Sequence, residues 1–146
     1  MEKKKIVVFG ATGTLGLYTT DYLAAKLPDE YEVVATGRRP VAFFEEKYPG
    51  KVTYVQVNID DETSFSTLPS ERVFAVVHFA GALPAYMEGY DPRSYVRSNV
   101  MGTLNVLEYA RRSGATRIIY TQTISDYDGY FDEMVELLDD MPRRVP

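Results

Sequence analysis

The sequence predicts an α/β fold with a doubly wound parallel sheet, and three observations support this prediction. Short apolar runs rich in valine and isoleucine alternate with amphipathic stretches, a glycine-rich turn follows the first run, and no internal repeat interrupts the pattern. Strands that alternate with helices pair in parallel and are covered on both faces. Right-handed crossovers favour the strand order 3-2-1-4-5, with a ligand crevice between strands 1 and 4 at their carboxyl ends.

The first half of the chain supplies three strands and the helices between them. The β-branched run Ile6–Phe9 predicts the first strand, and the amphipathic stretch Thr14–Leu27 predicts the first helix. Glu32–Thr36 is the second strand, since two valines lie at its centre. Val41–Tyr48 is a short helix that follows a proline and ends near Pro-Gly, and Val52–Val57 is the third strand.

The second half continues the alternation. Thr63–Leu68 predicts a short helical turn and Phe74–Phe79 the fourth strand. Ser94–Ser113 is the longest expected helix. Two arginines in its last turn and the glycine that follows mark its end. Arg117–Tyr120 is the fifth strand. Apolar residues fall at helical spacing in the long helix: Val96, Val100, Leu104 and Leu107.

Composition narrows the function classes. The chain has 146 residues, 45% hydrophobic and 25% charged, which suits one globular domain with a real core. Its net charge of −5 argues against a nucleic-acid surface. With one histidine and no cysteine, we expect no disulfide scaffold and no metal site. The basic start precedes an apolar run too short for a signal peptide or membrane span, so we expect a cytoplasmic protein.

Three glycines follow the first strand in the spacing Gly-x-x-Gly-x-x-Gly. Gly10 lets the chain reverse, Gly13 lets backbone approach a pyrophosphate, and Gly16 lets helix and strand pack closely. The helix start offers unpaired N–H groups and a positive dipole end to an anion. A dinucleotide is therefore the expected ligand, although the same turn also occurs without one. The candidate residues are Gly10, Thr12, Gly13, Thr14, Leu15 and Gly16.

The end of the second strand bears on the choice between NAD and NADP. An acidic residue there binds the ribose 2′-hydroxyl of NAD, whereas an arginine accommodates the 2′-phosphate of NADP. This chain has Gly37-Arg38-Arg39, with two cations and no carboxylate. Because an arginine fork pairs well with phosphate, we expect NADP in preference to NAD.

Other strand ends carry weaker candidates. Asn58 and Ile59 follow the third strand, where they either meet adenine or simply form a turn. His78 lies within an apolar strand and is more simply a satisfied core residue than a catalytic one. After the fifth strand, the hydroxyl of Thr123 is placed to hold a substrate oxygen. Small residues follow the fourth strand and let a cofactor lie against backbone: Ala80, Gly81 and Ala82.

Together these segments resemble the extended short-chain dehydrogenase/reductase family, also called the NAD-dependent epimerase/dehydratase family. The matching pieces are Phe9–Gly16, Val76–Gly81, Ser98–Glu108 and Arg117–Thr123 with Tyr127, and they reach to about residue 129. The resemblance implies a Rossmann-type fold and hydride transfer between NAD(P) and a substrate, a nucleotide sugar among the options.

The resemblance also implies residue roles. It assigns the three turn glycines to the pyrophosphate, Asn58 and Ile59 to adenine, and Ala80 and Gly81 to the nicotinamide side. Asn99 lies near the active site, Thr123 matches an active-site serine or threonine, and the loop Leu83–Tyr90 borders the substrate. The family's Tyr-x-x-x-Lys pair does not follow the fifth strand. The one literal match, Tyr22 to Lys26, falls in the first helix, on the wrong side of the cofactor.

The chain therefore reads as the cofactor-binding part of a longer enzyme, truncated before the later strands and the substrate lobe. We expect a dinucleotide-binding domain over residues 1–125 and an acidic loop or short helix over 126–146, in which Phe131, Met134, Val135, Leu137 and Leu138 are the apolar residues. Such a half domain exposes a sheet edge, which predicts pairing with another chain, a homodimer among the options, or poor stability. The alternative is a non-catalytic NADP(H)-sensing module that acts through a protein partner.

Overall fold

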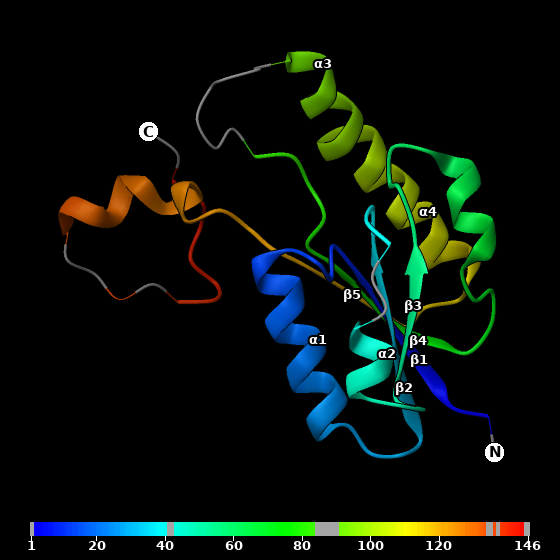
Figure 1. Ribbon diagram of the computed structural model, residues 1–146. Helices are drawn as coiled ribbons and strands as arrows, with labels where there is room; N and C mark the ends of the chain where they lie inside the picture. Colours follow the sequence, from blue (N-terminus) through cyan, green and yellow to red (C-terminus); the bar gives the residue numbers. More distant parts are fainter. Residues whose placement is uncertain (1, 41–42, 84–90, 134–135, 137, 145–146) are drawn as a thin grey trace.

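The computed structural model describes residues 2–40, 43–83, 91–133, 136 and 138–144. Its centre is a five-stranded parallel sheet (Figure 1), and the strand order β3-β2-β1-β4-β5 confirms the predicted topology. A parallel sheet needs a crossover between successive strands, and the helices supply it. The strands are β1 Lys4–Phe9, β2 Tyr31–Gly37, β3 Val52–Gln56, β4 Val73–His78 and β5 Arg117–Tyr120.

The crossover elements lie on both sides of the sheet. Helices α1 and α2 cover one face, and the 3-10 helix η1 and helix α4 cover the other (Figure 1). The predicted start of the second helix, residues 41–42, lies outside the described residues. The elements are α1 Thr14–Lys26, α2 Phe43–Lys47, η1 Glu62–Thr67, α3 Pro92–Tyr95, the π-helix η2 Val96–Gly102, α4 Thr103–Arg112 and the 3-10 helix η3 Ile124–Glu133.

Alternate residues of β1 build two separate cores. Val7 and Phe9 point toward α4 and η1, where Phe9 stacks on Phe65 with ring centroids 5.5 Å apart. Ile6 and Val8 point toward α1 and α2. Because side chains alternate along a strand, one continuous apolar run fills both faces of the sheet. The two cores fix the carboxyl ends of β1 to β4, where a ligand crevice is expected.

The longest helical stretch differs from its sequence prediction. It begins at Pro92, which Asp91 caps by accepting a hydrogen bond from the Arg93 N–H at 3.0 Å, and it continues to Arg112 through the π-helix η2. A π-turn inserts an extra residue and so changes which side chains face inward. Ser98 and Gly102 are buried, whereas four apolar residues at helical spacing are exposed: Val96, Val100, Leu104 and Leu107. The spacing marks the helix but not the side that packs.

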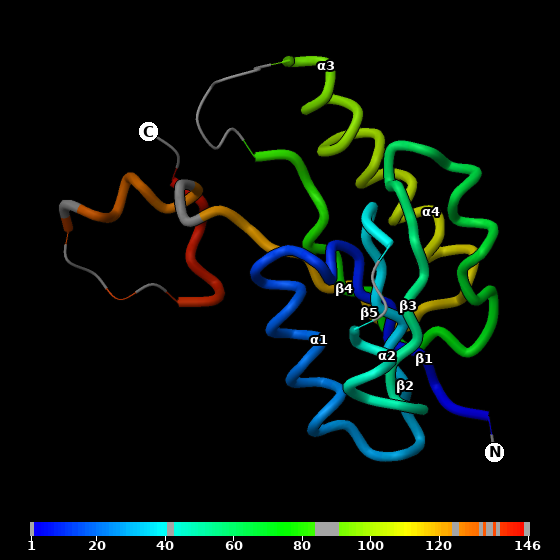
Figure 2. Tube along the Cα trace, in the orientation of Figure 1, coloured from blue at the N-terminus to red at the C-terminus, as the bar shows by residue number. Residues whose placement is uncertain are grey.

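The segment after β5 leaves the sheet and folds back on itself (Figure 2). The Arg144 N–H donates to the Asp126 carbonyl at 2.9 Å, and the Gly129 N–H donates to the Arg144 carbonyl at 3.0 Å. The 3-10 helix η3 spans Ile124–Glu133. Three apolar residues of the predicted acidic loop or short helix lie outside the described residues: Met134, Val135 and Leu137.

Two kinds of feature are missing from the described residues. None of the helices there has the length and apolar character needed to cross a bilayer. The same part of the chain holds no group of three or more histidine, cysteine, aspartate or glutamate side chains placed to share a metal ion.

Candidate functional site

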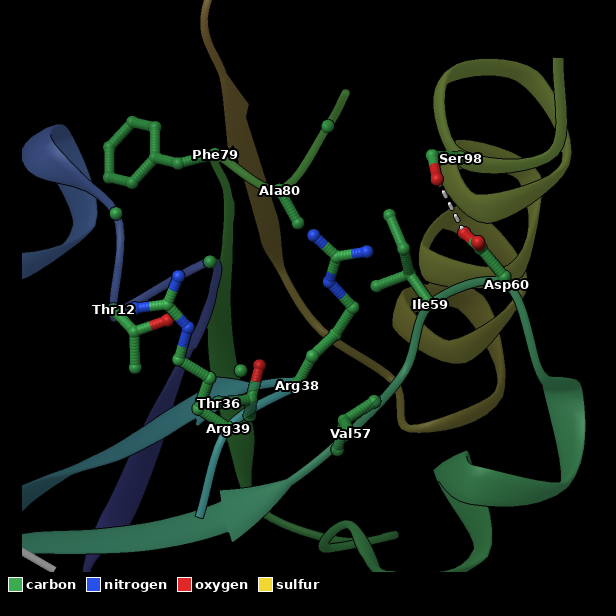
Figure 3. A pocket seen from close by; sticks show the side chains of 14 residues that line it. Thr12, Thr36, Arg38, Arg39, Val57, Ile59, Asp60, Phe79, Ala80 and Ser98 are labelled. Carbon is green, nitrogen blue, oxygen red and sulfur yellow. Dashed lines mark hydrogen bonds between the residues drawn. The ribbon is translucent and has the colours of Figure 1, made fainter. Parts of the chain in front are cut away.

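A pocket of about 220 Å³ opens at the carboxyl ends of β1, β2, β3 and β4 (Figure 3). It lies where crossovers diverge on either side of β1, the position at which open α/β sheets bind ligands. The turn after β1 forms one wall, the loop after β2 supplies two cations, and η2 contributes one buried serine. The lining residues are Gly10, Thr12, Gly13, Thr36, Gly37, Arg38, Arg39, Val57, Ile59, Asp60, Phe79, Ala80, Gly81 and Ser98.

The turn between β1 and α1 depends on two glycines. Gly10 has φ +80°, and a Cβ there would lie 2.7 Å from the Ala80 nitrogen. At Gly16 a Cβ would lie 2.1 Å from the Gly10 carbonyl oxygen, so any side chain would push the helix away from the turn. These contacts seat the amino end of α1 directly beneath the pocket.

The amino end of α1 is electrostatically suited to an anion. Gly13 is the N-cap, it carries no side-chain cap, and the first turn contains no acidic residue. The positive end of the helix dipole is therefore neither capped nor neutralised by the helix's own side chains. Because Gly13 also lines the pocket, backbone N–H groups and a favourable potential meet any ligand that enters.

Two arginines form the cationic side of the pocket. Figure 3 shows Arg38 extending toward Ala80 and Ile59, and Arg39 extending toward Thr12. Neither guanidinium forms an ion pair with a described residue. Their charge is therefore left for a ligand.

Strand β3 fixes the backbone of both arginines. The Tyr54 hydroxyl donates to the Arg39 carbonyl at 2.5 Å, and the Gln56 side-chain amide donates to the Arg38 carbonyl at 2.8 Å. Burial raises the pKa of the Tyr54 phenol, so this hydroxyl keeps its proton and remains a donor. Neither residue was a candidate from the sequence, because the contact joins separate strands.

Asn99 holds the rim of the pocket beside Gly81. Its side chain accepts from the Ala82 N–H at 2.7 Å and donates to the Ala82 carbonyl at 3.0 Å. This two-point contact ties η2 to the chain that leaves β4, and it lies beside Gly81, whose Cβ would lie 3.0 Å from the Asn99 oxygen. Asn99 and Ala82 are therefore not lining residues themselves, but they hold in place the chain that carries the lining residue Gly81.

Eight of the residues named from the sequence as cofactor-binding line the pocket: Gly10, Thr12, Gly13, Arg38, Arg39, Ile59, Ala80 and Gly81. Thr14, Leu15 and Gly16 occupy the first turn of α1, outside the lining. Asn58 is exposed, and its side-chain oxygen accepts from the Asp60 N–H at 3.3 Å, so it forms a turn. Thr123 is exposed beyond the end of β5 and does not line the pocket.

His78 and the pair Tyr22 and Lys26 lie away from the pocket. His78 is 7% exposed, its Nε2 lies 3.0 Å from the Thr103 hydroxyl, and its Nδ1 has no hydrogen-bond partner among the described residues. Burial lowers the pKa of its imidazole. Tyr22 and Lys26 are both exposed in the second half of α1, while the amino end of that helix faces the pocket.

Sequence reasoning missed several lining residues, above all Asp60 and Ser98. Ser98 donates a hydrogen bond to the Asp60 carboxylate at 2.8 Å, from a site that is 7% exposed. No signal in the sequence marked Ser98, because the apolar spacing does not show which side of its helix packs against the sheet. Asp60 gave no signal, since its partner is 38 residues away. Thr36, Val57 and Phe79 complete the missed lining.

The strand order and a glycine-bordered pocket at the carboxyl edge define a Rossmann-type domain of the NAD-binding class. Comparison with known sequences supplies the family. The chain belongs to the NAD dependent epimerase/dehydratase family, whose sequence profile matches residues 6–140.

Individual relatives agree with this assignment. The chain is 26% identical to an uncharacterized protein of Methanocaldococcus jannaschii, covering 88% of this chain and 42% of that protein. It is 29% identical to UDP-glucose 4-epimerase of Erwinia amylovora, covering 84% of this chain and 37% of that enzyme. The fold is similar to that of a mutant uronate dehydrogenase of Agrobacterium tumefaciens complexed with NAD, with a TM-score of 0.72 and 22% sequence identity. The match covers 98% of this chain and 49% of that enzyme. The chain thus spans about two fifths to half the length of these relatives.

Proposed function

We propose that this chain binds NADP, in preference to NAD, as the cofactor-binding part of an epimerase, dehydratase or reductase that acts on a nucleotide sugar by hydride transfer. One observation carries the proposal: an uncapped helix amino end and two arginines without ion pairs among the described residues face the same pocket. The UDP-glucose 4-epimerase relative supports the nucleotide-sugar class.

The residues present fit a dinucleotide. Gly10, Gly13 and the first turn of α1 would hold the pyrophosphate, because Gly10 and Gly13 line the pocket at the amino end of this helix. Arg38 and Arg39 would pair with a 2′-phosphate on the adenosine ribose, since guanidinium groups bind phosphate through two parallel hydrogen bonds. Ala80 and Gly81 would leave room for the nicotinamide half.

The bound nicotinamide would accept or supply the hydride, and this chain's own residues would bind and orient it. Among the described residues that line the pocket, the ionisable side chains are Arg38, Arg39 and Asp60, and this lining offers no histidine, lysine or tyrosine to move a proton. Thr123 would help to orient the substrate hydroxyl, with Asn99 supporting the loop beside it. We therefore expect that these 146 residues alone bind cofactor and show no turnover.

A titration with both dinucleotides tests the proposal. Parent chain should bind NADP more tightly than NAD, and the double variant Arg38→Ala with Arg39→Ala should weaken NADP binding about 10- to 100-fold, as expected for lost charged hydrogen bonds. Binding of NAD should change less than about threefold. Isothermal titration calorimetry measures both, and Arg111→Ala is the matched control because that arginine pairs with Glu108 on α4. Tighter binding of NAD than NADP by the parent chain would overturn the cofactor preference.

The second candidate is a non-catalytic module that senses NADP(H) and acts through a protein partner. The exposed apolar residues of β5 favour it, since they offer a surface for a second polypeptide. An assay of these 146 residues with UDP-glucose and NADP or NAD tests both candidates at once. Rapid turnover without any added protein would contradict both candidates, because each predicts binding without chemistry by these residues alone.

A further inference from the structure

A second pocket lies between η1 and the last turn of α4, on the face of the sheet that these two helices cover. Its volume is about 310 Å³, and it shares no lining residue with the pocket at the carboxyl ends of the strands. Small-molecule sites have volumes of about 300–1,000 Å³, so this one suits a small ligand. Such a ligand would bind without competing for the place of a dinucleotide.

The floor of the second pocket is apolar and firmly packed. Phe65, Leu68 and Tyr109 line it, each between 5% and 7% exposed. The Phe65 and Tyr109 rings both contact Phe9 in the core, at centroid distances of 5.5 Å and 5.7 Å. The Tyr109 hydroxyl donates to the Pro69 carbonyl at 2.8 Å, so its hydrogen-bonding need is met within the protein. The floor therefore offers a ligand apolar contact and asks for no polar group there.

The rim of the second pocket carries two opposite charges. Glu62 begins η1 and Arg112 ends α4, and one guanidinium nitrogen lies 3.8 Å from a carboxylate oxygen of Glu62. This distance is too long for a hydrogen bond, and both side chains are more than half exposed. Because water and salt screen such a pair, it is weak, and a ligand that offers better partners to both ends can replace it.

Charge complementarity selects the class of ligand. A simple anion is attracted by Arg112 but repelled by Glu62, and a simple cation meets the reverse. A zwitterion satisfies both side chains. In an α-amino acid the ammonium and the carboxylate are attached to one carbon, so its two charges are close enough to meet side chains that end 3.8 Å apart. Its own side chain would then lie over the apolar floor and lose contact with water.

We propose that the second pocket binds a free α-amino acid with an apolar side chain, whose carboxylate pairs with Arg112 and whose ammonium pairs with Glu62. The inference goes beyond the proposed function and does not depend on it, because the two pockets have separate linings.

A nuclear magnetic resonance titration of the isotope-labelled chain with L-phenylalanine tests the site. Amide resonances of residues 62–70 and 109–113 should move with a millimolar dissociation constant, whereas those of Gly10 and Gly13 should stay in place. Saturating NADP should leave this constant unchanged. Three probes each lack one recognised feature and should bind at least about fivefold more weakly: glycine without the side chain, phenylpropionate without the ammonium, and phenethylamine without the carboxylate.

Variants of the rim test the two charges separately. Arg112→Gln and Glu62→Gln should each weaken binding of L-phenylalanine about five- to tenfold, the loss expected for one charged hydrogen bond at an exposed site. Arg111→Gln is the matched control for the cation, since this neighbouring arginine lies outside the lining and pairs with Glu108. Glu71→Gln is the control for the anion, an exposed carboxylate outside the lining. Both controls should keep the dissociation constant of the parent chain.

Four results would overturn the inference. They are no binding of L-phenylalanine in the millimolar range, its displacement by NADP, equal binding of phenylpropionate or phenethylamine, and an equal loss of affinity in a control variant and its partner at the rim. The probe series uses the parent chain alone, so it decides the question even if a variant fails to fold. The proposed function would stand in every one of these cases, because its titration concerns the other pocket.

Discussion

Strands β1 and β5 contain the same kinds of residue but have opposite surroundings. Val7, Val8 and Phe9 of β1 are 0% exposed, whereas Ile119 and Tyr120 of β5 are 53% and 61% exposed. β1 pairs with β2 and β4 and is covered by helices on both faces. Within the part of the chain that the structure describes, β5 pairs with β4 alone. Strand β1 is thus buried by a neighbouring strand on each side and by helices on both faces, whereas the edge strand β5 keeps its apolar residues exposed.

The difference has a functional side. The proposed ligand pocket lies over the buried strands, where two cores hold the turn after β1 rigid. Apolar residues are also exposed on α4, where Leu104 and Leu107 are 48% and 46% exposed. Exposed apolar residues that gather into a patch commonly mark a protein contact. Substitutions in the buried strands beside the pocket should therefore lower the free energy of unfolding more than substitutions of the exposed residues on β5 and α4.

The largest contrast should come from two aromatic residues at equivalent ends of the two strands. Phe9→Ala should lower the free energy of unfolding by about 3–5 kcal/mol, because it opens a cavity among packed rings. Tyr120→Ala should lower it by less than about 1 kcal/mol, because that ring is largely solvated. Urea denaturation followed by circular dichroism measures both. Equal losses for the two variants would contradict the contrast.

A smaller effect should separate two glycines of the same turn. Gly16→Ala should cost about 3 kcal/mol, since its Cβ would overlap backbone at 2.1 Å and the helix must shift. At Gly13 a Cβ would lie 3.4 Å from the Gly10 oxygen, an ordinary contact, so Gly13→Ala should cost less than about 1 kcal/mol. Thermal unfolding compares the pair. A greater loss at Gly13 than at Gly16 would show that the close packing of helix and turn is not the limiting contact.

The free energy of unfolding should also depend on pH, because His78 is buried at the end of β4. Burial lowers the pKa of this imidazole below its ordinary value of 6.5, so the unfolded chain binds the proton more readily. The contribution of His78 to the free energy of unfolding should therefore be fully present above pH 6.5. It should be lost as the pH falls from 6.5 toward the lowered pKa, by about 1.4 kcal/mol per unit of pKa difference. Urea denaturation from pH 7.5 to 5 measures the slope. His78→Gln should flatten it, and an unchanged slope in this variant would assign the effect to other groups.

The smallest effect on stability should come from the exposed half. Leu104→Lys with Leu107→Lys should change the free energy of unfolding by about 0.5 kcal/mol or less, because both side chains are half exposed. Pairing of two copies is one of the options that the exposed sheet edge leaves open, and if these leucines take part in it, the same variant should weaken the association through the loss of apolar contact area. Analytical ultracentrifugation measures this association. A parent chain that stays monomeric throughout would contradict the homodimer option.

Much of the site was readable from the sequence because its determinants are local. The turn from Gly10 to Gly16 and the pair Arg38 and Arg39 follow directly from strand ends, which a parallel sheet always brings to one edge. The anchors Tyr54 and Gln56 were not readable, because each contacts a residue on another strand. The link between Ser98 and Asp60 was hidden for the same reason.

The sequence by itself determined the order of strands and helices and the glycine turn, since periodicity and backbone sterics act between near neighbours. It also determined the helix over residues 92–112 to within a few positions. Only the tertiary structure decided which side of that helix packs: the π-turn in η2 directs Ser98 inward and leaves Val100 exposed. Packing between distant segments chooses among faces that local spacing leaves equivalent, because burial depends on what another part of the chain places opposite.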